Sequence, residues 1–185
     1  MIKSKKRRRS VMSFHHALER LQQHEVFQAW REENPDHYLV HGFLMLGPDV
    51  KSEWQIGFYH PDADVISAFA VDDEGAVTMN PPSEAFKDTV VIRELDVNHV
   101  EHDVDRALAD AEEHRAAKYR GHDPARTIVL LQHLERGQVW NITFVTSTFA
   151  VCNIKLDAKT HEIVHSSCET LLAWGDAQKG ERQHD

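Results

Sequence analysis

The stretch Trp54-Gln55-Ile56-Gly57-Phe58 returns 86 residues later as Trp140-Asn141-Ile142-Thr143-Phe144. In both stretches an aromatic or branched apolar residue occupies every second position, which is the period of a β-strand that buries one face. A shorter match accompanies them, because Val71-Asp72 corresponds to Leu156-Asp157. Recurrence at this spacing predicts two copies of one supersecondary unit, packed as a pseudo-symmetric pair.

In each half we expect one helix followed by an antiparallel meander of about four strands, the simplest way to cover the apolar face of a sheet. Ser13 is the expected N-cap of a first helix over residues 13–32. The apolar stripe of this helix rotates near His24, which indicates a bend or contact with two surfaces. Trp54, Ile56 and Phe58 should face the helix. Strands are expected at 38–46, 53–60, 64–71 and 76–79, with a further edge strand at 89–92.

The second half predicts a helix from Asn98 to about Arg120, where Asn98 and Glu101 resemble a capping box. Gly121 and Pro124 are expected to end that helix. Strands are expected at 127–134, 139–145, 149–156 and 162–166. The fold class is therefore α+β, with a disordered basic arm at 1–12, a first unit at 13–88, a second unit at 89–176 and a flexible tail at 177–185.

Composition indicates a folded globular chain, since 41% of its 185 residues are hydrophobic and 28% are charged. No apolar run is long enough to cross a bilayer, and no membrane partner is expected. Six of the 21 basic residues lie within the first nine positions, so the remaining body carries 15 basic against 30 acidic residues. Such a body repels nucleic acid, and only the basic arm could act as a nucleic-acid tether. We expect a solvated, disordered arm.

The second unit resembles a PepSY-type domain, a small helix-plus-meander module related in shape to cystatins. The likeness is carried by residues 140–144 and by the run from Ile154 to Ile163. The family usually has glycine where His161 stands, and the first unit keeps that glycine as Gly75. Members are often found outside the cytoplasm and associated with peptidase propeptides, where an inhibitory or chaperone-like role has been proposed. The motifs that carry the resemblance are turn and core signatures, so it implies the fold more than a function.

Several residues could carry chemistry, and each also has a structural interpretation. His99 and His102, with Glu101 between them, could place two imidazoles near one helix face, but zinc normally needs three or four protein ligands. We favour solvent-exposed histidines. Cys152 is in strand register with core candidates and is interpreted as a small buried residue, and Cys168 as a more exposed one. Two cysteines are too few for a disulfide scaffold and favour a reducing compartment, the cytoplasm.

Residues at matching positions of the two halves also have both a functional and a structural interpretation. Trp54 and Trp140 could line a ligand groove, but their alternation with apolar neighbours favours the core. Tyr59 and His60 are freer to bind a partner. Asp72 and Asp157 occupy matching turns, where a carboxylate can accept hydrogen bonds from nearby backbone amides. No catalytic, cofactor-binding or metal-ligating residue is assigned, and no cofactor is expected.

The sequence thus predicts a non-catalytic, cytoplasmic binding or regulatory protein that binds a protein or peptide, with exposed strand edges as the contact. A small-ligand-binding protein or an enzyme with a pocket between helix and sheet is the first alternative. Nucleic-acid association through the basic arm is the second. The oligomeric state stays open.

Overall fold

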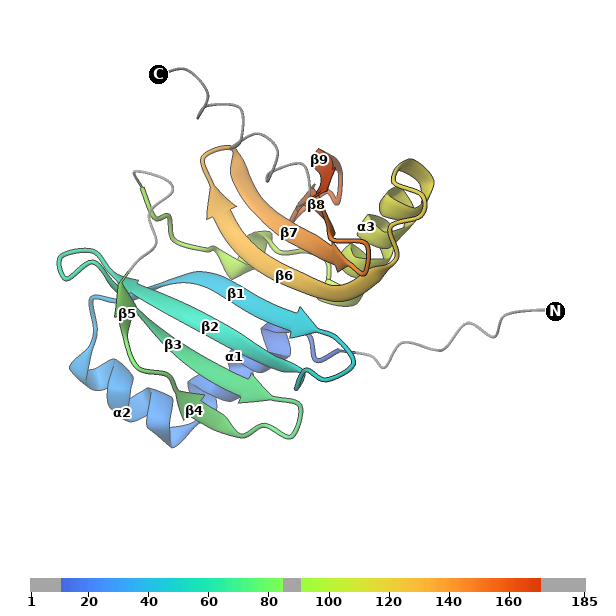
Figure 1. The fold of residues 1–185 in the computed structure, drawn as a ribbon. Helices are drawn as coiled ribbons and strands as arrows, with labels where there is room; N and C mark the ends of the chain where they lie inside the picture. The colour runs from blue at the N-terminus through green and yellow to red at the C-terminus, as the bar shows by residue number, and fades with distance from the viewer. Residues whose placement is uncertain (1–10, 85–90, 171–185) are drawn as a thin grey trace, which may run out of the picture.

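The computed structural model describes residues 11–84 and 91–170 and has an α+β fold (Figure 1). Its strands form one antiparallel sheet in the order β4-β3-β2-β1-β6-β7-β8-β9, and β5 also pairs with β3. The elements are α1 (Phe14–Gln23), α2 (Glu25–Glu33), β1 (Tyr38–Leu46), β2 (Glu53–His60), β3 (Val65–Asp72), β4 (Val77–Met79), β5 (Ser83–Glu84), the 3₁₀-helix η1 (Val97–His99), α3 (Val104–Lys118), β6 (Pro124–Leu134), β7 (Gly137–Thr146), β8 (Ala150–Asp157) and β9 (Ile163–Thr170).

The predicted bend at His24 is confirmed, and it divides the first helical segment into α1 and α2. His24 has extended backbone angles, and its N–H donates to the carbonyl of Leu21 over 3.0 Å. Its Nδ1 accepts the N–H of Val26 at 3.3 Å and so caps the start of α2. A helix that changes direction here can turn both of its apolar stripes onto the sheet. Phe14 and Phe27, one from each helix, are accordingly buried.

The second helical segment begins later than predicted, and the proposed capping box at Asn98 and Glu101 is wrong. Asp96 accepts the Asn98 N–H at 2.9 Å and caps only η1. Asp103 accepts the Val104 N–H at 2.7 Å and caps α3. Aspartate and asparagine are about equally good N-caps. In the structure the carboxylates of Asp96 and Asp103 cap η1 and α3, so these two helices begin at Val97 and Val104. The expected edge strand at 89–92 is not found at residues 91–92, and residues 89–90 lie outside the described ranges.

β1 and β6 join the two meanders edge to edge at the middle of the sheet (Figure 1). Phe43 lies opposite Leu130, and the flanking pairs are Gly42 with Leu131 and Leu44 with Val129. The side chains of Leu44 and Val129 belong to the same buried cluster, so the helix-covered faces of the two meanders are continuous.

The core between helices and sheet is filled by large side chains from both halves. Trp54 and Trp140 are 1% and 0% exposed, and their ring centroids lie 6.4 Å apart. Trp54 also contacts Phe14 edge-on at 5.3 Å. Phe58 and Phe144 complete the row on β2 and β7. The interpretation of both tryptophans as core residues is confirmed, and these rings fill the space between the helices and the middle of the sheet. A hollow of about 790 Å³ lies beside α1, where Leu18, Gln22 and Leu39 are among the residues that line it.

Candidate functional site

β9 forms one end of the sheet and is its longer free edge. Seven of its eight residues pair with β8, Val164 lies at an irregularity in the register, and no other described strand pairs with β9. At the opposite end the edge consists of β4, with three residues, and β5, with two. Ile163 and Val164, at the start of β9, are 38% and 57% exposed. An exposed strand edge offers unpaired backbone N–H and C=O groups to a further strand.

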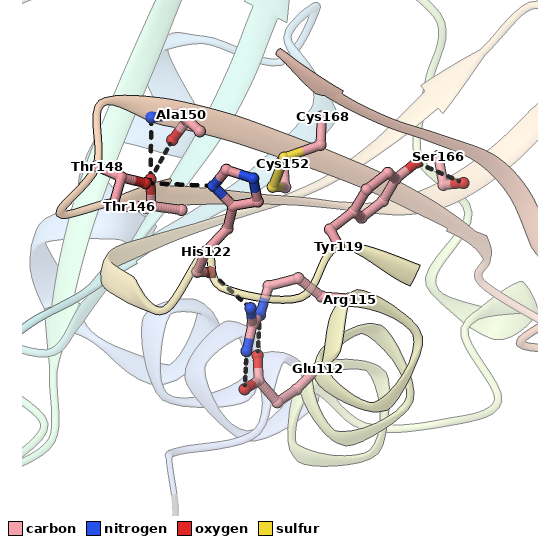
Figure 2. Close-up of a disulfide and its surroundings, with 10 residues drawn as sticks. All are labelled: Glu112, Arg115, Tyr119, His122, Thr146, Thr148, Ala150, Cys152, Ser166 and Cys168. Atoms are coloured by element: carbon pink, nitrogen blue, oxygen red, sulfur yellow. Dashed lines mark hydrogen bonds and ion pairs between the residues drawn. A yellow bond between two sulfur atoms is a disulfide. The ribbon is translucent and has the colours of Figure 1, made fainter. Parts of the chain in front are cut away.

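A disulfide between Cys152 and Cys168 ties β9 to β8, as Figure 2 shows. The two residues are direct cross-strand partners, and their Cα atoms are 3.9 Å apart. The buried position predicted for Cys152 is confirmed at 0% exposure. The sequence analysis considered two cysteines too few for a disulfide scaffold and did not pair them, whereas in the structure they form a disulfide. The register of β8 with β9, which the sequence does not reveal, brings together residues 16 positions apart.

The end of α3 also holds β9 in place. Lys118 Nζ donates to Ser166 Oγ over 2.7 Å. The Tyr119 hydroxyl donates to the same oxygen over 3.2 Å, as Figure 2 shows. Together with the disulfide, these bonds connect the middle of β9 to both a neighbouring strand and a helix. β9 is therefore held in the extended conformation with which a partner strand would pair.

Arg115 anchors the segment between α3 and β6 beneath this edge. Its side chain is buried, and Nε and Nη2 donate to the two carboxylate oxygens of Glu112 over 2.9 and 2.8 Å (Figure 2). These charge-assisted bonds raise the pKa of Arg115. Nη1 donates to the His122 carbonyl over 2.5 Å, and His122 in turn contacts the Thr148 hydroxyl at 3.2 Å. The side chain thus links α3 to the turns next to β8.

His161 occupies the turn before β9 and contacts α3. Its φ of 62° is left-handed, which explains why glycine suits this position, and Gly75 in the first half has a φ of 90°. Its Nδ1 lies 3.0 Å from Asp110 Oδ2, which also accepts from Arg106 Nε at 2.9 Å. Burial alone would raise the pKa of Asp110, but the bonds from His161 and Arg106 outweigh it and lower that pKa. The departure from glycine marked His161 in the sequence, whereas its partner could not be predicted.

The histidines considered for metal binding do not converge. His99 Nδ1 pairs with Asp96 Oδ2 at 2.6 Å, and Glu101 pairs with Lys159 at 3.5 Å. The ring of His102 instead lies against His161, with centroids 4.5 Å apart. Within residues 11–84 and 91–170 no group of three or more His, Cys, Asp and Glu side chains is placed to hold a metal ion.

The interpretation of Tyr59 and His60 as free binding residues is wrong. Tyr59 is 6% exposed, and its hydroxyl donates to Asp64 Oδ1 over 2.8 Å. His60 Nδ1 accepts the Ala63 N–H at 3.1 Å, and its ring contacts His37 at 4.8 Å. Both side chains are used to hold the turn between β2 and β3.

The predicted roles of Asp72 and Asp157 as turn residues are confirmed. Asp72 Oδ1 accepts the N–H groups of residues 74 and 76 at 3.0 and 2.8 Å. Asp157 Oδ1 accepts those of residues 159 and 160 at 2.9 and 2.8 Å. The basic arm lies almost wholly outside the described residues, as does the tail from 177 onward.

No family model matches this chain, and no curated protein matches it. Among solved structures it is similar to a protein from Clostridium difficile 630 described as a "putative lipoprotein". The two share 13% sequence identity with a TM-score of 0.54 over 78% of this chain and 91% of the other. Identity this low shows a common fold and carries no function. Within the described residues no helix has both the length and the apolar character needed to cross a membrane.

Proposed function

We propose that this chain is a non-catalytic binding protein that captures an extended protein or peptide segment along β9. The observation that carries the proposal is an eight-residue edge strand, unpaired on one side among the described residues and fixed on the other by the Cys152–Cys168 disulfide. Backbone pairing would supply affinity, as in other cases of β-augmentation. Because β9 is already ordered, a partner strand would lose little affinity to ordering the site.

The side chains of β9 suggest the character of the partner. Ile163 and Val164 present exposed apolar surface at one end of the strand, whereas Ser167 and Glu169 make the other end polar. A segment with apolar residues at one end and polar residues at the other would match this edge. The opposite edge is too short to pair with a segment of the same length.

We also propose that the two halves are copies of one helix-on-meander unit, similar in shape to cystatins and PepSY domains. Asp72 and Asp157 make corresponding turn bonds, and Gly75 and His161 share a left-handed φ. β1 and β6, the first strands of the two meanders, pair antiparallel at the middle of the sheet, and a two-fold relation between the halves requires this arrangement. Expression of residues 91–170 alone tests this proposal, because a copy of a complete unit should fold by itself, and a chain that stays unfolded with the disulfide oxidised would contradict it.

An oxidising compartment fits the disulfide better than the cytoplasm that the sequence predicted. Reducing systems keep most cytosolic thiols reduced, so a Cys152–Cys168 bond favours an exported chain. The description of the similar Clostridium difficile protein as a "putative lipoprotein" favours the same compartment. Alkylation of free thiols in intact cells, followed by mass measurement, tests this. Two alkylated cysteines would restore the cytoplasmic prediction.

Binding at β9 is tested by one pair of matched variants. Peptides selected from a displayed library against the full chain would be measured by calorimetry on the parent, Ile163→Lys and Met79→Lys. Both positions are 38% exposed and lie on edge strands at opposite ends of the sheet. A lysine on an edge strand opposes pairing with a further strand. We expect Ile163→Lys to weaken binding about tenfold or more, equivalent to about 1.4 kcal/mol, and Met79→Lys to leave it unchanged.

Methylation of alternate backbone nitrogens in a selected peptide removes the donors needed for strand pairing. We expect this to abolish binding while the peptide side chains are unchanged. Equal affinity of the two lysine variants, or full affinity of the methylated peptide, would refute binding at the β9 edge.

A further inference from the structure

A cavity of about 430 Å³ lies on the face of the sheet opposite the helices. Its floor comes from β1, β2, β3 and β6, and its side comes from residues 80–84 and 91–93. This volume falls within the range of small-molecule sites in proteins. Among the residues that line it are His41, Gln55, Ala68, Leu130, Gln132 and Arg93. The cavity is separate from the β9 edge, which lies at the end of the sheet.

Small residues beside His41 create the hollow. Gly57 is the direct partner of His41 on β2, and Ala68 lies opposite Gly57 on β3. The imidazole lies over Gly57, since a Cβ atom at that position would be 2.2 Å from His41 Cε1. On the other side His41 is paired with Gln132 of β6. The ring therefore occupies a space that a side chain at residue 57 would fill.

Three polar side chains in this cavity have unused hydrogen-bonding capacity. Of the hydrogen bonds and ion pairs between described residues, none involves the side chains of His41, Gln55 or Gln132. Each glutamine amide carries both donors and an acceptor. Burial lowers the pKa of His41 to about 4, so its imidazole is neutral near neutral pH and also carries one donor and one acceptor. All three side chains are partly buried, and their polar atoms stay accessible to a small molecule in the cavity.

The remaining lining limits the charge and shape of a ligand. Ala68 and Leu130 are apolar, and the two charged residues, Arg93 and Glu84, have opposite signs and are exposed. His133 Nδ1 is already engaged with the Glu94 carbonyl at 2.6 Å. The polar groups on the floor of the cavity, His41, Gln55 and Gln132, are thus uncharged near neutral pH, and they favour an uncharged ligand that offers both a donor and an acceptor.

We propose that this cavity binds an uncharged, planar heterocycle with adjacent donor and acceptor groups, of the cyclic-amide class. A glutamine amide forms two parallel hydrogen bonds with such an edge, and the ring fits against the imidazole and the apolar floor. Gln132, the direct partner of His41, would form this pair, Gln55 would donate to the second lone pair of the carbonyl oxygen, and His41 would contact the ring. The proposal stands independently of strand binding at β9.

The test uses 2-pyridone as the probe and N-methyl-2-pyridone as the control, with the full, isotopically labelled chain observed by NMR. The two molecules share ring and carbonyl, but the control lacks the N–H donor. We expect saturable shifts of the Gln55 and Gln132 side-chain amides with 2-pyridone and at least about fivefold weaker binding of the methylated probe, the effect of one lost hydrogen bond.

Gln55→Leu and Gln132→Leu should each weaken 2-pyridone binding about fivefold or more. Gln22→Leu is the matched control, because it makes the same chemical change at an exposed residue of α1 outside this cavity. Thermal unfolding of each variant verifies folding, and the comparison of the two probes on the unchanged chain does not depend on any variant. No saturable shift at millimolar 2-pyridone, equal binding of both probes, or equal loss in Gln22→Leu would overturn the proposal.

Discussion

Replacing Gly42 by alanine should test the closest helix-to-sheet contact in the core. A Cβ atom at residue 42 would lie 2.3 Å from Phe14 Cε2 and 2.6 Å from Cδ2. Phe14 is fully buried at the start of α1, which Ser13 caps through the His16 N–H at 3.1 Å. Its ring also packs against Trp54 at 5.3 Å. The phenyl ring has no free space to enter, so the helix itself must shift.

The magnitude follows from two opposing effects. Overpacking a filled core costs about 1–3 kcal/mol. Removing glycine from a strand stabilises the chain by about 0.4–1 kcal/mol, because the unfolded state loses conformational freedom. We therefore expect Gly42→Ala to lower the free energy of unfolding by about 1–2 kcal/mol, measured by urea denaturation under conditions that keep the disulfide oxidised.

A double-mutant cycle shows whether Phe14 is the cause. Phe14→Ala alone should cost about 3–5 kcal/mol, because it leaves a cavity in the core. The double variant should cost less than the sum of the single changes by about 1–3 kcal/mol, since the new methyl group enters space that the ring has left. Gly57→Ala is the comparison, because His41 can turn into the neighbouring cavity. Additive costs, or a Gly42→Ala chain as stable as the parent, would refute the argument.

Three further perturbations have expected outcomes. His41 binds a proton below about pH 6.5 in the unfolded state but only below about pH 4 in the folded state. The free energy of unfolding should therefore fall by up to about 3 kcal/mol as the pH drops from about 6.5 to about 4. Urea titrations should show that His41→Gln removes this part of the pH dependence. Reduction of the disulfide should cost about 3 kcal/mol, given its separation of 16 residues, and unchanged denaturant midpoints with and without a phosphine reductant would contradict this. His161→Gly and His161→Ala both lose the Asp110 contact, but only alanine keeps the cost of a left-handed φ, so calorimetry should find the glycine variant more stable by about 1 kcal/mol.

The elements that follow from local patterns were predicted well. Alternation of Trp54, Ile56 and Phe58 identified both the strand and its buried face. The start of α3 was missed, because Asn98 and Asp103 are both acceptable caps and only packing of the helix on the sheet selects between them. Tyr59 was misjudged for a similar reason. Its hydroxyl partner, Asp64, becomes a neighbour only through the geometry of the turn.

The sequence by itself determined most of the strands, the turn aspartates and the position shared by Gly75 and His161, since each depends on residues a few positions apart. It missed β5 and ended β9 at residue 166 instead of Thr170. Only the tertiary structure decided that β1 pairs with β6, that Cys152 meets Cys168, and that His41 faces a cavity instead of the core. These features depend on which strands pair and in what register, and local sequence does not fix either. A shift of one residue in that register would turn every side chain of a strand to the other face, and the free energy of the whole core selects against it.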